Sequence, residues 1–209
     1  VAEIVEIARV HGAIVHTDAA QSIGKVPIDV RSLGVDLLSI AGHKLYAPKG
    51  VGALYLKHGT PLAPFVLGAG HERGLRPGTE NVAFIVGLGL ACEIAARDLE
   101  LVAARIRRLR DEFWGRLVAG VPGIQLNGHP TLRLPNTLSV RFPSVSGNAV
   151  LARATGVAAS TGSACHAGHE QASAVILAMG VSADGALGTI RLTLGRATTA
   201  TDIELACNA

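Results

Sequence analysis

The stretch Ser39-Ile-Ala-Gly-His-Lys-Leu-Tyr-Ala-Pro-Lys-Gly-Val-Gly52 decides the fold, and Lys44 lies at its centre. The apolar run at residues 35–40 predicts a buried strand, and a proline and two glycines lead into a second strand at 53–56. Partial burial at a strand end makes a lysine amine lose its charge more easily. A neutral amine attacks carbonyl carbon, as Schiff-base chemistry requires. Taken alone, Lys44 could equally be a lysine that extends from a loop into solvent.

The composition is typical of a globular α/β protein. The 209 residues are 49% hydrophobic and only 3% aromatic, which suits buried strands that read as apolar runs. The formal charge of +3 is too small to indicate a nucleic-acid partner, and the arginines form no stripe interleaved with aromatic residues. No apolar run is long enough to span a bilayer and no signal peptide opens the sequence. We therefore expect a cytoplasmic protein without a membrane partner.

The cysteines and the two ends of the sequence narrow the class further. Cys92, Cys165 and Cys207 are too widely spaced for a disulfide framework or a metal site, which indicates a reducing compartment. The sequence begins without methionine inside a predicted helix at residues 1–10, and it ends soon after another helix opens at Thr201. We expect the chain to be part of a longer protein and to hold no metal.

Two predicted strands bring polar side chains to one edge of a sheet. Residues 13–17 form a short apolar strand that ends at Asp18, and Gln21 follows closely. A short helix at 30–33 then precedes the strand that leads to Lys44. Because open α/β sheets bind ligands at the carboxyl ends of their strands, we expect Asp18 and Lys44 at the same edge. Asp18 alone could equally be a turn residue.

The middle of the chain predicts a long loop followed by helical sequence. Residues 68–81 carry too many glycines and charges for a regular element, so they form a loop of the kind that often carries function. Residues 82–96 predict a buried apolar helix, whereas 97–118 are amphipathic and more exposed. This change of composition gives the predicted boundary between two domains, residues 1–98 and 99–209.

The second domain is predicted to be a small α+β unit. A loop of small residues at 161–168 holds Cys165, whose partly exposed thiol can act as a thiolate, although it could equally be a small buried hydrophobic residue. Arg191 lies in the last strand and points away from its apolar neighbours. We expect strands at 138–142, 157–160 and 189–194, and helices at 148–154 and 172–179.

These side chains together match what pyridoxal 5'-phosphate (PLP) requires. The cofactor's ring nitrogen must stay protonated, and the carboxylate of Asp18 can hold that proton in place. Gln21 can donate a hydrogen bond to the phenolic oxygen, and His43 and Thr79 can bind phosphate oxygens. Lys44 supplies the amine for a Schiff base with the aldehyde.

Five motifs, read in order, resemble those of a known enzyme family. The sequence is similar to cysteine desulfurases of the NifS/IscS type, within the class V aminotransferase family of fold-type I PLP enzymes, over essentially all of its length. The motifs are His16-Thr-Asp-Ala-Ala-Gln21, Ala41-Gly-His-Lys44, Arg76-Pro-Gly-Thr-Glu-Asn81, Ser160-Thr-Gly-Ser-Ala-Cys165 and Ile190-Arg-Leu-Thr-Leu-Gly-Arg196.

The resemblance implies a fold and a set of cofactor contacts. Residues 1–98 would be the C-terminal part of a large PLP-binding domain with a mixed and largely parallel sheet, and 99–209 a small α+β domain. Lys44 would be the Schiff-base lysine. The other cofactor contacts would be Asp18 to the pyridine nitrogen, Gln21 to the phenolic oxygen, His43 to the phosphate, and Thr79 to the phosphate of the other subunit of a homodimer.

The resemblance also implies the reaction. Arg191 would pair with the α-carboxylate of L-cysteine through a bidentate fork. The thiolate of Cys165 would take the substrate sulfur as a persulfide, leaving L-alanine, and would pass the sulfur to an acceptor protein. Such a sulfurtransferase can serve iron–sulfur cluster assembly among other pathways.

Two departures from the family pattern keep alternatives open. Ala41 stands where relatives commonly have a phosphate-binding serine, and His166 follows Cys165 in a variant that looks more like selenocysteine lyases, which act on L-selenocysteine. The family's amino-terminal half, with its cofactor-stacking histidine and phosphate loop, is not present in this chain. An alternative of another class is therefore a truncated, catalytically incompetent fragment without cofactor.

Overall fold

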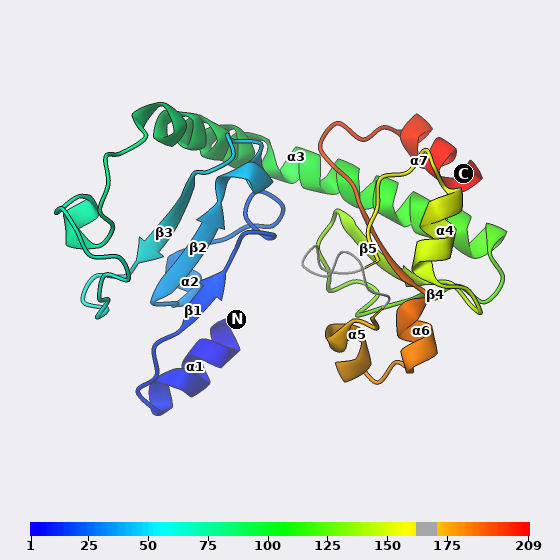
Figure 1. Cartoon of the computed structure of the whole chain (residues 1–209), viewed down its shortest axis with the longest axis horizontal. Coiled ribbons are helices and arrows are strands. Elements are labelled where there is room, and N and C mark those ends of the chain that lie inside the picture. The colour runs from blue at the N-terminus through cyan, green and yellow to red at the C-terminus, as the bar shows by residue number, and fades with distance from the viewer. Residues whose placement is uncertain (162–170) are drawn as a thin grey trace. The chain divides into compact units, whose positions relative to one another are not determined.

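A computed structural model describes residues 1–161 and 171–209 of the chain (Figure 1). These residues separate into two compact units, Val1–Leu99 and Glu100–Ala209. Cys165 and His166 lie outside the described residues. Within the described ranges, no helix combines the length and the apolar character needed to cross a membrane.

The first unit is built on a three-stranded mixed sheet in the order β1-β2-β3 (Figure 1). Its strands are β1 (His16–Asp18), β2 (Leu37–Ala41) and β3 (Gly52–Leu56). β1 pairs parallel with β2, and β3 pairs antiparallel with β2. The first strand is shorter at its start than the sequence predicts, but its carboxyl end lies at Asp18 as expected.

Two helices complete the core of the first unit. α1 (Ala2–Val10) buries Val5, and α2 (Val30–Leu33) has the predicted bounds. The carboxylate of Asp29 caps α2 by accepting from the backbone N–H of Arg31 at 2.9 Å, and Gly34 ends the helix in a left-handed conformation. The buried cluster consists of Val5, Ala19, Val35 and Leu38.

The predicted burial of the long helical segment is wrong. α3 (Val82–Gly120) is one helix of 39 residues. Its apolar first part exposes Val82 and Val86 by 66% each and Leu90 by 57%, because no other described element covers these faces. Its charged second part instead buries a stripe at helical spacing that forms the core of the second unit, namely Ile106, Leu109, Phe113 and Leu117.

The second unit contains a three-stranded antiparallel sheet in the order β4-β5-β6. Its apolar face, which includes Leu138, Val140, Ile190 and Leu192, packs with the stripe on α3. The strand predicted at 157–160 is reduced to a single bridge between Ser160 and Arg191. The elements are β4 (Gln125–Leu126), β5 (Thr137–Arg141), α4 (Gly147–Arg153), α5 (Ala174–Ala178), α6 (Ala183–Leu187), β6 (Thr189–Thr193) and α7 (Ala200–Asn208).

Candidate functional site

The candidate site of the first unit lies where β1 and β2 end. Asp18 is the last residue of β1 and is in register with Ser39 of β2. Lys44 lies in a single 3-10 turn, η1 (Gly42–Leu45), that begins directly after β2. Because the two strands are parallel, their carboxyl ends share one edge of the sheet. The structure therefore brings Asp18 and Lys44 to the same edge.

Close packing fixes the turn that carries Lys44. The N–H of Gly42 donates to the carbonyl of Val51 at 2.9 Å, and a Cβ at position 42 would lie only 2.7 Å from that oxygen. The side chain of Leu45 is 5% exposed and anchors the other end of the turn. His43 and Lys44 themselves are exposed. The turn thus holds an accessible amine on a constrained backbone, rather than in the partly dry environment that the sequence suggested.

The carboxylate of Asp18 is oriented and has an acceptor to spare. Its Oδ1 accepts from the backbone N–H of Ala20 at 2.8 Å, and Oδ2 accepts no hydrogen bond from the described residues. His16 lies two residues earlier on the same strand face, and its Nε2 is 2.7 Å from the hydroxyl of Ser39. An exposed, pre-oriented carboxylate on the same sheet edge as a lysine suits a ligand that presents an N–H group and a carbonyl.

Gln21 and Thr79 are both exposed, but only Gln21 is close in sequence to the residues at this edge. Gln21 lies in the series of turns that follows Asp18. Thr79 lies in the loop after the short helix η2 (Glu72–Gly74), where Arg76 donates to the carbonyl of Gly78 at 3.1 Å. Within the described chain, no hydrogen bond links Thr79 to Asp18, His43 or Lys44.

A second lysine, Lys25, lies beside Lys44 and was missed by the sequence reasoning. Burial lowers the pKa of Lys25, and the nearby charge of Lys44 lowers it further. The two segments meet where Gly24 packs on Leu45, since a Cβ on Gly24 would lie 2.5 Å from Leu45 Cδ2. Among the described residues neither lysine forms an ion pair, so this edge carries a positive charge that suits an anionic group. In the sequence, the one feature that indicates this close packing of the two segments is Gly24, the residue before Lys25.

Arg191 belongs to the second unit. It lies on β6, exposed and on the side opposite the buried Ile190 and Leu192, as predicted. Its N–H donates to the carbonyl of Ser160 at 2.7 Å, so it is paired with the segment that leads toward Cys165.

The residues of the first unit fit PLP in their chemistry. Lys44 supplies an exposed primary amine, Asp18 a carboxylate oxygen without a partner, and Lys25 and His43 supply nitrogen donors for a phosphate. Ala41, as expected from the sequence, offers no hydroxyl at the position before this turn.

Comparison with known proteins gives one family over nearly the whole chain. The profile described as aminotransferase class-V matches residues 1–205. Among curated proteins, the chain is 44% identical over 204 residues to cysteine desulfurase NifS of Azotobacter vinelandii, which covers 97% of the chain and 51% of that protein. It is also 44% identical over 207 residues to cysteine desulfurase IscS 1 of Archaeoglobus fulgidus, covering 97% and 53%. The chain thus spans about half the length of the curated relatives it matches.

Solved structures resemble the fold closely. A NifS-like protein from Rickettsia africae ESF-5 superposes with a TM-score of 0.89 at 30% identity, covering 99% of this chain and 55% of that chain. SspA in complex with cysteine superposes with a TM-score of 0.73 at 35% identity, covering 92% and 53%.

Proposed function

Because the chain belongs to the aminotransferase class-V family, a family of PLP-dependent enzymes, we propose that it is the C-terminal portion of a cysteine desulfurase. The observation that carries this proposal is the shared edge of β1 and β2, at which both Asp18 and Lys44 are located. The names of the curated relatives support the choice of reaction. In this assignment, residues 1–98 belong to the large cofactor domain and 99–209 form the small domain.

The residues at this edge would hold the cofactor. Lys44 Nζ would form the covalent link, and the free Oδ2 of Asp18 would accept a hydrogen bond from the protonated ring nitrogen. Gln21 would bind the phenolic oxygen, while His43 would bind the phosphate. Thr79 would reach the phosphate of the second subunit in a homodimer. When bound, PLP withdraws electrons from the α-carbon of an amino acid and so allows bonds next to that carbon to break.

The substrate would be L-cysteine, held through its carboxylate by the exposed guanidinium of Arg191. Lys44 Nζ would move the proton at the α-carbon. The thiolate of Cys165 would attack the substrate sulfur, forming a sulfur–sulfur bond while the carbon–sulfur bond breaks. The electron pair stays with the substrate carbon, which takes up a proton and leaves as L-alanine. The outer sulfur of the Cys165 persulfide would then pass to an acceptor protein in the cytoplasm, in a pathway such as iron–sulfur cluster assembly.

Trapping of PLP on Lys44 tests the cofactor assignment. The purified chain is incubated with PLP, reduced with borohydride and digested, and the peptides are identified by mass spectrometry. We expect the reduced adduct on the peptide that contains Lys44, no adduct there in Lys44→Ala, and an unchanged yield in the matched variant Lys49→Ala. A colourless protein without an adduct on Lys44 would contradict the proposal and favour the incompetent fragment.

A second measurement tests the sulfur transfer. After incubation of the PLP-loaded protein with L-cysteine, the peptide containing Cys165 should gain the mass of one sulfur atom, and Cys165→Ser should show no gain. Parallel turnover of L-cysteine and L-selenocysteine separates the desulfurase from a selenocysteine lyase, which would act on the second substrate alone. A PLP-loaded wild type whose Cys165 peptide stays unmodified with both substrates would overturn the proposed step.

A further inference from the structure

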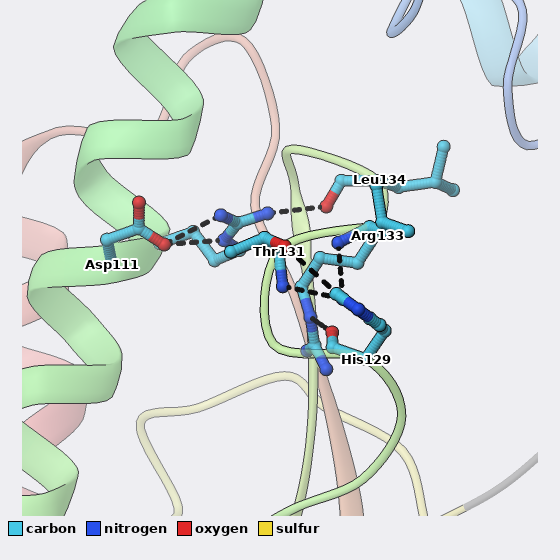
Figure 2. Close-up of polar contacts among 7 residues, drawn as sticks. Asp111, His129, Thr131, Arg133 and Leu134 are labelled. Carbon is cyan, nitrogen blue, oxygen red and sulfur yellow. Dashed lines mark hydrogen bonds and ion pairs between the residues drawn. The ribbon is translucent and has the colours of Figure 1, made fainter.

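The loop between β4 and β5 is closed by its own side chains (Figure 2). Arg133 donates from Nε to the carbonyl of His129 at 2.8 Å and from Nη2 to the carbonyl of Asn127 at 2.6 Å. From α3, Arg110 donates through Nη1 to the carbonyl of Leu134 at 2.8 Å. Both arginines therefore fix the loop through neutral backbone oxygens.

His129 makes the contact that depends on a proton. Its Nδ1 accepts from the backbone N–H of Leu132 at 2.9 Å and from that of Thr131 at 3.1 Å. The Thr131 hydroxyl lies 3.3 Å from the same nitrogen. A backbone N–H can only donate, so Nδ1 must carry a lone pair. The closed loop consequently requires a neutral imidazole with its hydrogen on Nε2.

Charged side chains also lie at the base of this loop. Arg110 is buried, with 5% of its side chain exposed, and it donates through Nε and Nη2 to Oδ1 of Asp111 at 2.9 and 2.7 Å. Asp111 is the acidic partner of the cluster and is 60% exposed. Burial and the charge of Arg110 lower the pKa of Arg133, while Asp111 acts in the opposite direction. The cluster holds two guanidinium groups and one solvated carboxylate, so its net charge is positive.

We propose that the Asn127–Leu134 loop is a proton-sensitive latch, closed when His129 is neutral and opened when His129 takes up a proton. A proton on Nδ1 removes the lone pair and turns two hydrogen bonds into contacts between donors. The His129 side chain is exposed, so protons reach it from solvent. Because the closed loop uses the Nδ1 lone pair as its acceptor and a protonated imidazole has no such lone pair, closure is favoured at high pH.

The opening is confined to the loop because both of its ends are tied to the sheet. The N–H of Asn127 donates to the carbonyl of Ser139 at 2.8 Å, and its side-chain amide donates to the Thr189 hydroxyl at 3.2 Å. At the other end, the N–H of Leu194 donates to the carbonyl of Asn136 at 2.8 Å. Release of the latch would therefore free the backbone N–H groups of Thr131 and Leu132, while Arg133 keeps its two backbone acceptors and the sheet stays paired.

Two measurements on the wild-type chain test the latch. The ¹⁵N shifts of the His129 ring should report an unprotonated Nδ1 and a protonated Nε2 at pH 8. Hydrogen exchange of the Thr131 and Leu132 amides, corrected for the intrinsic rate at each pH, should be about tenfold faster at pH 5.5 than at pH 8, the size expected for losing a shared acceptor. A proton on Nδ1 at pH 8, or protection that does not change with pH, would overturn the proposal.

Matched substitutions separate the lone pair from a general effect of the side chain. In His129→Asn the amide oxygen lies near the place of Nδ1 and cannot titrate, so protection should persist at both pH values. In His129→Gln the amide group lies nearer the place of Nε2, so protection should be low at both. The variant His58→Asn, which alters an exposed histidine of the first unit, should keep the wild-type pH dependence. A pH dependence that survives in His129→Asn would contradict the latch.

Discussion

The turn that carries Lys44 depends on a residue without a side chain. Any Cβ at position 42 would lie 2.7 Å from Val51 O and 3.0 Å from Val51 Cγ1, and the first of these atoms is backbone that cannot move away alone. We expect Gly42→Ala to lower the free energy of unfolding by about 1–3 kcal/mol, the usual cost of overpacking. The displaced turn should also reduce the yield of PLP trapped on Lys44. Urea unfolding and the borohydride assay measure these two effects.

Gly89→Ala is the matched control for this substitution. Gly89 lies inside α3, and a Cβ there meets nothing within 4 Å. Because alanine favours a helix over glycine by about 0.5–1 kcal/mol, this variant should be slightly more stable and should trap PLP normally. Equal trapping by Gly42→Ala and the wild type would show that the turn tolerates a side chain and does not position Lys44.

At this scale the sequence predicted some site residues and missed others. Asp18 and Lys44 could be placed on one edge because strand alternation and parallel pairing follow from local patterns. Lys25 could not be placed there, because its position beside Lys44 depends on Gly24 packing against Leu45, a contact between residues that are distant in the sequence. The exposure of Lys44 was also unpredictable, since burial depends on which other segments cover the turn.

Among the elements, α7 has a complete capping box. Thr199 Oγ1 accepts from the N–H of Asp202 at 3.2 Å, and Asp202 Oδ2 accepts from the N–H and the hydroxyl of Thr199, both at 2.8 Å. We expect Thr199→Ala to lower the free energy of unfolding by about 1 kcal/mol, as for other N-cap substitutions. Thermal unfolding at neutral pH measures it, and Thr201→Ala, an exposed position in the same helix, should be close to neutral.

The same cap gives an expected pH dependence. The hydrogen bonds from Thr199 lower the pKa of Asp202 below its ordinary value. The folded state therefore holds a proton on Asp202 less tightly than the unfolded chain, and the stabilisation is present above the unfolded pKa of about 3.9. It disappears as the pH falls through the lowered pKa. The stability difference between the wild type and Thr199→Ala should accordingly narrow in acid, and a constant difference would contradict this account.

Elements with a strong periodic pattern were predicted with accurate positions. The bounds of α2 are the predicted ones. The bounds of β2 and β6 differ from the predicted ones by at most two residues at each end, because their apolar runs end at clear turn signals. The prediction that residues 82–96 of α3 form a buried helix is wrong, whereas the amphipathic character predicted for 97–118 agrees with the buried stripe. An apolar run indicates that a helix face packs against another segment. In the described chain the amphipathic stripe at 106–117 is buried, whereas most of the apolar run at 82–96 is not.

At the scale of the whole molecule, the first unit exposes apolar side chains on two of its helices. On α1, Ile4, Ile7 and Val10 are exposed by 62%, 65% and 82%, and their spacing of three places them along one side of the helix. The first part of α3 adds the exposed Val82 and Val86. Monomeric proteins rarely leave contiguous apolar surface larger than a few hundred Å² uncovered. The relatives are about twice as long and have further residues with which to cover such faces.

We therefore expect the 209-residue chain on its own to associate through these faces, and light scattering over a range of concentrations would show it. Ile4→Lys and Ile7→Lys should shift the equilibrium toward the monomer while leaving unfolding within about 0.5 kcal/mol of the wild type, because both side chains are already in solvent. Glu6→Lys changes the charge of the same helix at an exposed site without removing apolar surface, so it should associate like the wild type. If Glu6→Lys shifts the equilibrium toward the monomer to the same extent as Ile7→Lys, repulsion between charges rather than lost apolar contact explains the effect. A wild type that stays monomeric at every concentration would show that these faces do not drive association.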